Sequence, residues 1–142
     1  MNTQSNTTHL EHVRGKLSTL WVFLLFNMVF ADIFSFMYPG ALQQIMTGNT
    51  DGTHVTPVFL LIAAAVTEIP IAMVFLSRLL KNGVNRWVNT VGGVITIVWV
   101  VALGSMTAPY IFFASIEVVC SLAIVWLAWR WHKPEAQPSL VS

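Results

Sequence analysis

Four long apolar segments alternate with short polar stretches along this chain. They cover residues 17–38, 57–80, 88–106 and 109–131. A transmembrane helix needs about 20 mainly apolar residues to cross roughly 30 Å of hydrocarbon, and each segment meets that requirement. Because short connections make consecutive helices antiparallel, the pattern predicts an all-α membrane protein, an up-down bundle of four transmembrane helices.

Both ends of the chain are polar. We predict an N-terminal tail at residues 1–16, a four-helix transmembrane domain at 17–131 and a C-terminal tail at 132–142. Pro134 and Pro138 oppose helix in the second tail. The first apolar segment is longer than the core of a typical signal peptide, and no small-x-small cleavage site follows it, so we expect it to remain as a helix.

The composition agrees with a membrane protein. Hydrophobic residues make up 56% of the chain and charged residues only 9%, with a mean hydropathy of +0.70, whereas an ordinary soluble domain carries about 25% charge. The single cysteine, Cys120, excludes an intrachain disulfide. These values exclude a soluble globule.

The basic residues predict the orientation. All seven Lys and Arg fall on one side of the predicted membrane: Arg14, Lys16, Arg78, Lys81, Arg86, Arg130 and Lys133. By the positive-inside rule both tails are cytoplasmic, and the connections at 39–56 and 107–108 lie outside.

Three carboxylates lie within the predicted spans. Counting 1.5 Å per residue from the outer ends, Asp32, Glu68 and Glu117 lie about 9, 16 and 12 Å deep. An acid at a helix centre costs about 3 kcal/mol, so we expect each of the three to point into the bundle, toward the others or toward a water-filled cavity. Together with neighbours at similar depth they predict a polar layer for a ligand or proton: Glu68, Glu117, Asp32, Asn27, Thr96 and Ser121.

This layer contains no Lys, Arg or His. Three explanations remain open: the acids are protonated and hydrogen-bond to one another, they hold a cation, or they pair with a basic residue of another subunit. Pro70 leaves the Val66 carbonyl without its helical donor, which suits cation or proton binding as well as ordinary packing.

A second polar group is predicted at the inner rim. It comprises Arg78, Lys81, Asn85, Arg86 and Asn89. Orientation and attraction to anionic lipids, about 1 kcal/mol per basic residue, explain the basic members. A specific anion site is the sharper alternative.

Other chemistry-bearing residues carry weak signals. His9 and His12 are three residues apart without a further ligand, and we expect Cys120 to be a buried, inert thiol. We therefore predict no metal site and no cofactor. The sequence has no phosphate-binding glycine loop, HExxH helix or nucleophile elbow, and no basic domain for nucleic acid.

The strings LSTLWVFLLFNMVFADIFS, TEIPIAMVFLSRLL, NRWVN and FFASIEVVCSLAIVWLAWRW resemble a family of small bacterial four-helix membrane proteins, a domain of unknown function. The resemblance covers residues 17–131. It implies a location in the bacterial inner membrane and four spans, and it supplies no activity. The matching strings contain Asn27, Asp32, Glu68, Arg78, Asn85, Arg86 and Glu117.

Three functions remain open. In the first, the carboxylate pocket binds or moves a proton-coupled or cationic small solute, with Glu68 as the central carrier, Glu117 and Asp32 as coupled partners and Asn27 as an orienting group. In the second, the chain is a membrane enzyme whose paired carboxylates act as general acid and base on a lipophilic substrate. In the third, it is an accessory subunit whose acids pair with a partner's intramembrane Lys or Arg.

The expected partners follow from these functions. They are the lipid bilayer, a small solute or lipid, and a second copy of the chain, because so small a bundle would need to dimerise to offer a continuous path. No nucleic acid is expected.

Overall fold

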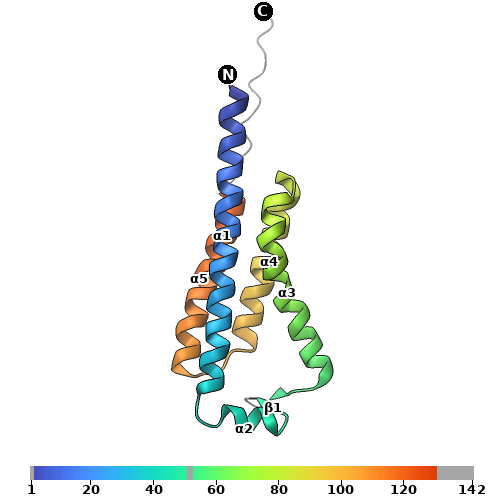
Figure 1. Ribbon diagram of the computed structural model, residues 1–142, viewed down its shortest axis with the longest axis vertical. Helices are drawn as coiled ribbons and strands as arrows, with labels where there is room; N and C mark the ends of the chain where they lie inside the picture. Colours follow the sequence, from blue (N-terminus) through green and yellow to red (C-terminus); the bar gives the residue numbers. More distant parts are fainter. Residues whose placement is uncertain (1, 51–52, 131–142) are drawn as a thin grey trace, which may run out of the picture.

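The computed structural model describes residues 2–50 and 53–130. Figure 1 shows a bundle of long helices with a small cap at one end. The long helices are α1 (Asn2–Met37), α3 (Pro57–Leu79), α4 (Asn82–Ala102) and α5 (Ala108–Arg130); the cap is α2 (Ala41–Met46) with the antiparallel strands β1 (Asn49–Thr50) and β2 (Thr53–His54). The predicted all-α membrane bundle is confirmed, and the predicted tail at 132–142 lies outside the described residues.

Each long helix is long and apolar enough to cross a membrane. The candidate spans are Glu11–Met37, Pro57–Leu79, Asn82–Ala102 and Ala108–Arg130. The third span, α4, begins at Asn82, six residues before the predicted start at residue 88. It follows directly after Lys81, which has an extended backbone. Its polar first turns read as a connection in the sequence, yet Asn85 and Asn89 are fully buried, so the polar segment belongs to the bundle.

The N-terminal segment is helical rather than a separate irregular tail. α1 runs without a break from Asn2 to Met37. No proline lies in this range, and the one glycine, Gly15, lowers helix stability by only about 1 kcal/mol relative to alanine. Nothing in the sequence therefore ends the helix where its apolar stretch begins.

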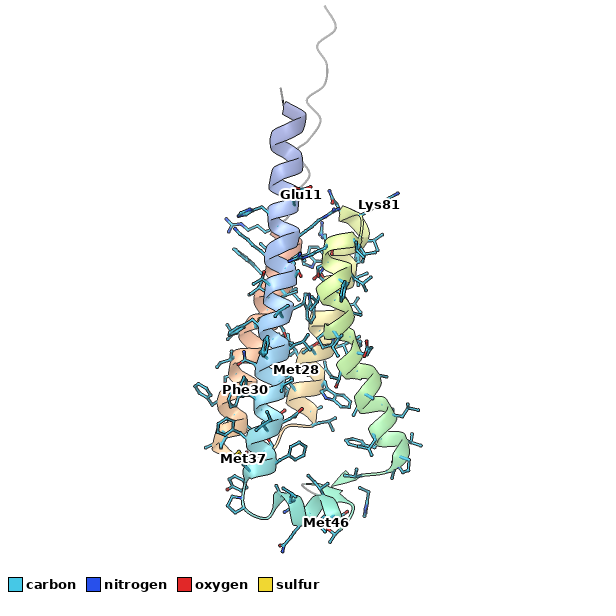
Figure 2. All side chains as sticks on the ribbon, viewed as in Figure 1. Glu11, Met28, Phe30, Met37, Met46 and Lys81 are labelled. Carbon is cyan, nitrogen blue, oxygen red and sulfur yellow. The ribbon has the colours of Figure 1, made fainter. Side chains whose placement is uncertain are left out.

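The helices are connected up and down. α1 packs against α3 and α5, and α4 packs against the same two helices. We call one end of the bundle the basic end, since the described lysines and arginines lie there: Arg14, Lys16, Arg78, Lys81, Arg86 and Arg130. We call the other the α2 end. Figure 2 shows Glu11 and Lys81 at the basic end and Met37 and Met46 at the α2 end.

α3 is packed unevenly along its length. Its buried residues are Pro70, Met73 and Ser77, all in the half toward the basic end. Between 57 and 69 every side chain is exposed or half-buried, and Figure 1 shows this part leaning away from the other long helices. The ring of Phe59 still stacks on Trp99 of α4, with 6.4 Å between centroids. The bundle is therefore tight near the basic end and open near the α2 end.

Candidate functional site

Glu117 of α5 is the acid that the bundle buries. Its side chain is 3% exposed, and its Oε1 is buried with no hydrogen-bond partner among the described residues. A buried polar group without a partner costs about 1–3 kcal/mol, and more if it is charged. The fold thus maintains an unsatisfied acid inside a membrane bundle, which is typical of a functional group.

The side chains around this level are polar as well. Ser121 lies one turn along α5, and its Oγ is also buried without a partner among the described residues. Asn27 and Thr96 are buried, but each hydrogen-bonds to its own helix: Asn27 donates to the Phe23 carbonyl at 3.0 Å and Thr96 to the Gly92 carbonyl at 2.9 Å. Glu117 and Ser121 are therefore the members of the predicted layer that have a buried side-chain oxygen without a partner among the described residues.

Asp32 lies five residues before the end of α1, nearer the α2 end than Glu117. It is exposed and lines a cavity of about 260 Å³. The polar side chains that share this cavity are Ser35, Tyr38, Gln44, Ser105, Thr107 and Tyr110. Asp32 also acts electrostatically on Glu117. The structure thus brings two of the three predicted acids together, one in the cavity wall and one inside the bundle.

Tyr110 of α5 also lines this cavity. It interacts electrostatically with Glu117 and Asp32, and its hydroxyl donates a 2.9 Å hydrogen bond to the Val100 carbonyl. Its ring lies against Gly104, where an added Cβ would clash with it. Tyr110 was not among the predicted site residues, although it lies seven residues before Glu117, a spacing that places both on one face of α5.

The expectation that all three acids face the interior is wrong for Glu68, which is exposed. The inward stripe of α3 is Pro70, Met73 and Ser77, and Glu68 lies about 160° around the helix from Pro70. The small side chains of Ala64, Ala65 and Ala72, one turn from Glu68, suggest a packing face in the sequence. The inward face is instead fixed by Ser77, which hydrogen-bonds across to Asn89.

The rim cluster predicted at the basic end divides into two parts. Asn85 and Asn89 are not at the rim; they are fully buried in a network that joins three helices. Trp21 Nε1 donates to Asn89 Oδ1 at 2.8 Å and Ser77 Oγ to the same oxygen at 3.2 Å, while Asn85 Nδ2 donates to the Ser77 carbonyl at 2.7 Å. α4 begins at Asn82, so Asn85 and Asn89 are both helical. Because they are four residues apart, their amides lie on the same inward face.

The basic members of that cluster differ in burial: Arg86 is half-buried, and its Nε is buried with no hydrogen-bond partner among the described residues. Arg78 and Lys81 are exposed, and the guanidinium of Arg86 lies 3.8 Å from the ring centroid of Trp129. The Trp129 indole in turn donates to Thr90 Oγ1 at 2.9 Å. An arginine stacked on a tryptophan fits a membrane interface, where both side chains are commonly found.

The side chains that could bind a metal ion do not form a cluster among the described residues. Among residues 2–50 and 53–130, no group of three or more His, Cys, Asp or Glu is placed to hold a metal ion. The Cys120 thiol is buried and lies 3.4 Å from the Leu20 carbonyl, to which it donates. The polar atoms available for a ligand are therefore those around Asp32, Tyr110 and Glu117.

Four apolar helices in an antiparallel bundle define a small multi-pass membrane protein. The chain belongs to DUF6326, a family of unknown function that matches residues 8–137. The resemblance stated from the sequence is thereby confirmed. No curated protein and no solved structure matches the chain.

Proposed function

We propose that the protein binds a proton-coupled or cationic small solute at Glu117, and that the solute arrives through the cavity beside Asp32. The observation that carries this proposal is the buried Oε1 of Glu117, which has no hydrogen-bond partner among the described residues. A proton, a cation or a donor group of a ligand satisfies such an oxygen. Asp32 supplies a second acid nearer the opening.

The charge distribution supports a cationic ligand. The polar cavity at the α2 end contains Asp32, hydroxyl groups and an amide, and no basic side chain lines it. The described lysines and arginines lie at the opposite end of the bundle. A cleft that is lined by charges of one sign and has low-dielectric walls concentrates ions of the opposite charge.

The packing supports entry from one end only. Toward the basic end, the buried hydrogen bonds of Trp21, Ser77, Asn85 and Asn89 fill the space between α1, α3 and α4. Movement of the solute across the membrane therefore requires a second arrangement of the helices, in which these contacts open. Binding at Glu117 requires no such change.

The orientation assigns the cavity to one side of the membrane. If the basic end is cytoplasmic, as the positive-inside rule predicts, the cavity opens to the outside of a bacterial inner membrane, with both termini inside. Solute would then reach Asp32 first and Glu117 second. Glu68, which the sequence suggested as the central carrier, is not part of this route because it lies on the outward face of α3.

Carbodiimide labelling tests the proposal directly. N,N′-dicyclohexylcarbodiimide partitions into membranes and reacts with protonated carboxyl groups, and peptide mass spectrometry identifies the modified residue. We expect labelling of Glu117 that is slowed by tetraphenylphosphonium or Na⁺, used as cationic probes. Glu117→Gln removes the labelled peptide, and Asp32→Asn weakens protection by the probe.

The matched control is Glu68→Gln, which removes an acid outside the route. We expect this variant to keep both the labelling of Glu117 and its protection. A purified wild-type protein whose Glu117 resists the carbodiimide, or whose labelling is the same with and without every probe, contradicts the proposal. Proton flux driven by the same probes in proteoliposomes then separates transport from binding.

A further inference from the structure

The exposed acid of α3 lies in an unfavourable position for a single chain. Glu68 is at the middle of the span Pro57–Leu79 and faces away from the bundle. The nearest basic residue along the helix, Arg78, is ten residues away, which is about 15 Å. An ionisable side chain that faces lipid at mid-membrane is costly, and such residues almost always face protein or water.

The surface around Glu68 is suited to close approach by another helix. Ala64 and Ala65 precede it by about one turn, Ala72 follows by one turn, and none of the three is buried in the bundle. Ala64 and Ala72 lie one turn on either side of Glu68, and small side chains let two membrane helices pack closely, so that a polar side chain between them can hydrogen-bond. The matching depth of α5 instead presents Val119, which is 66% exposed.

We propose that this face of α3, defined by Ala64, Ala65, Glu68 and Ala72, is the interface of a homodimer in which the Glu68 carboxyl groups of two copies hydrogen-bond to each other. The interface is separate from the site at Glu117, which α5 provides on the interior of each bundle.

Symmetry makes a second copy the partner that fits. Two copies inserted in the same orientation present α3 in parallel and Glu68 at the same depth, and a two-fold axis brings identical residues together. A carboxyl group that carries its proton is both donor and acceptor, so two of them satisfy each other. The second copy also supplies the second alanine stripe. A different protein would have to supply a polar or basic side chain at the same depth, whereas a second copy supplies one by symmetry.

The packing of α3 leaves this face available. From 57 to 69 the helix has no buried side chain, and its inward contacts are made by the opposite stripe. A second helix can therefore lie along Ala64, Ala65 and Glu68 without displacing α1 or α4, and it meets the half-buried Ala72 at the edge of the groove between α3 and α4.

Cysteine cross-linking in native membranes tests the geometry. In a Cys120→Ala background, single cysteines replace Ala64, Glu68 or Ala72, and Val119→Cys at matching depth on α5 is the control. We expect copper-phenanthroline oxidation to give disulfide-linked dimers at 68 and 72, and little product at 119. Equal cross-linking at 68 and 119, or none at any α3 position, overturns the proposal.

A matched pair of substitutions tests the role of the carboxyl group. Glu68→Gln keeps a side chain that both donates and accepts, whereas Glu68→Leu does neither. Interhelical polar contacts contribute about 0.6–2 kcal/mol, so the leucine variant should dimerise about 3- to 30-fold more weakly and the glutamine variant nearly as tightly as wild type. Energy transfer between labelled copies in detergent measures the association constant.

Two results contradict the dimer. One is a leucine variant that associates as tightly as wild type. The other is a wild-type chain that cross-links from position 68 to a different membrane protein and not to itself. Because Glu68 is exposed, thermal unfolding of both variants should match wild type, so a change in association is not a folding defect.

Discussion

The indole nitrogen of Trp21 lies 2.8 Å from Oδ1 of Asn89 and donates a hydrogen bond to it, and both side chains are fully buried. The same oxygen accepts from Ser77, so one asparagine joins α1, α3 and α4. Inside a membrane bundle, where lipid is as apolar as the packed side chains, such polar contacts and close packing take the place of the hydrophobic effect.

Trp21→Phe should therefore destabilise the bundle. The change removes the donor and leaves space beside Gly92, which the Trp21 ring contacts. We expect a loss of about 1–3 kcal/mol in the free energy of unfolding, measured by circular dichroism in detergent. Trp129→Phe is the control, because its bond to Thr90 is exposed and should contribute under about 1 kcal/mol. Equal losses in the two variants would contradict a structural role for the buried network.

Glu117→Met should stabilise the protein while removing its site. The substitution replaces an acid that has a buried, unpartnered oxygen with an apolar chain of similar length. We expect the free energy of unfolding to rise by about 1–3 kcal/mol, while probe-sensitive carbodiimide labelling disappears. Ser115→Ala, an exposed change on the same helix, should stay within about 0.5 kcal/mol of wild type. A strongly destabilised methionine variant would indicate that Glu117 is a satisfied structural group.

The neighbouring glycines Gly92 and Gly93 should respond differently to alanine. A Cβ at Gly93 would lie 2.8 Å from Cγ2 of Val125 on α5, whereas at Gly92 the nearest atom, in the Trp21 ring, is 3.4 Å away. Alanine gains about 1 kcal/mol of helix propensity over glycine at either position. Thermal melts in detergent should thus show Gly92→Ala at or above wild type and Gly93→Ala below it. The reverse order would mean that α4 and α5 are not in this close contact.

The orientation predicted from the basic residues can be tested with two cysteines in the Cys120→Ala background. Thr47 lies at the α2 end and Gly83 at the basic end, and Gly83 has nothing within 4 Å of an added Cβ. In intact cells a membrane-impermeant thiol reagent should label Thr47→Cys and should reach Gly83→Cys only after permeabilisation. The opposite pattern would place the cavity of Asp32 on the cytoplasmic side.

The four spans could be predicted because lipid imposes a strict rule. Within the hydrocarbon region every backbone group must find its partner inside the structure, so a long apolar run has to be a helix. The lengths of the runs therefore predicted the bundle. The polar start of α4 escaped this rule, because Asn85 and Asn89 are satisfied by each other and by Ser77 and Trp21, which are distant in sequence.

The faces of the helices could not be predicted in the same way. In a soluble bundle the apolar stripe faces inward, but a membrane helix is apolar all round, so its sequence has little contrast between core and lipid. The sequence therefore suggested Glu68 as the central carrier and Glu117 as its partner, although the bundle buries only Glu117. The difference arises from packing between helices, which Pro70 and Ser77 decide for α3.

The uneven packing of α3 has a mechanical consequence. Its end toward Arg78 is held by Met73 and Ser77, while the end at Pro57 touches the bundle through Phe59. Because the helix is held at one end, a small rotation near Pro70 moves the backbone at Pro57, about 20 Å further along the helix, by more than it moves the backbone beside Pro70.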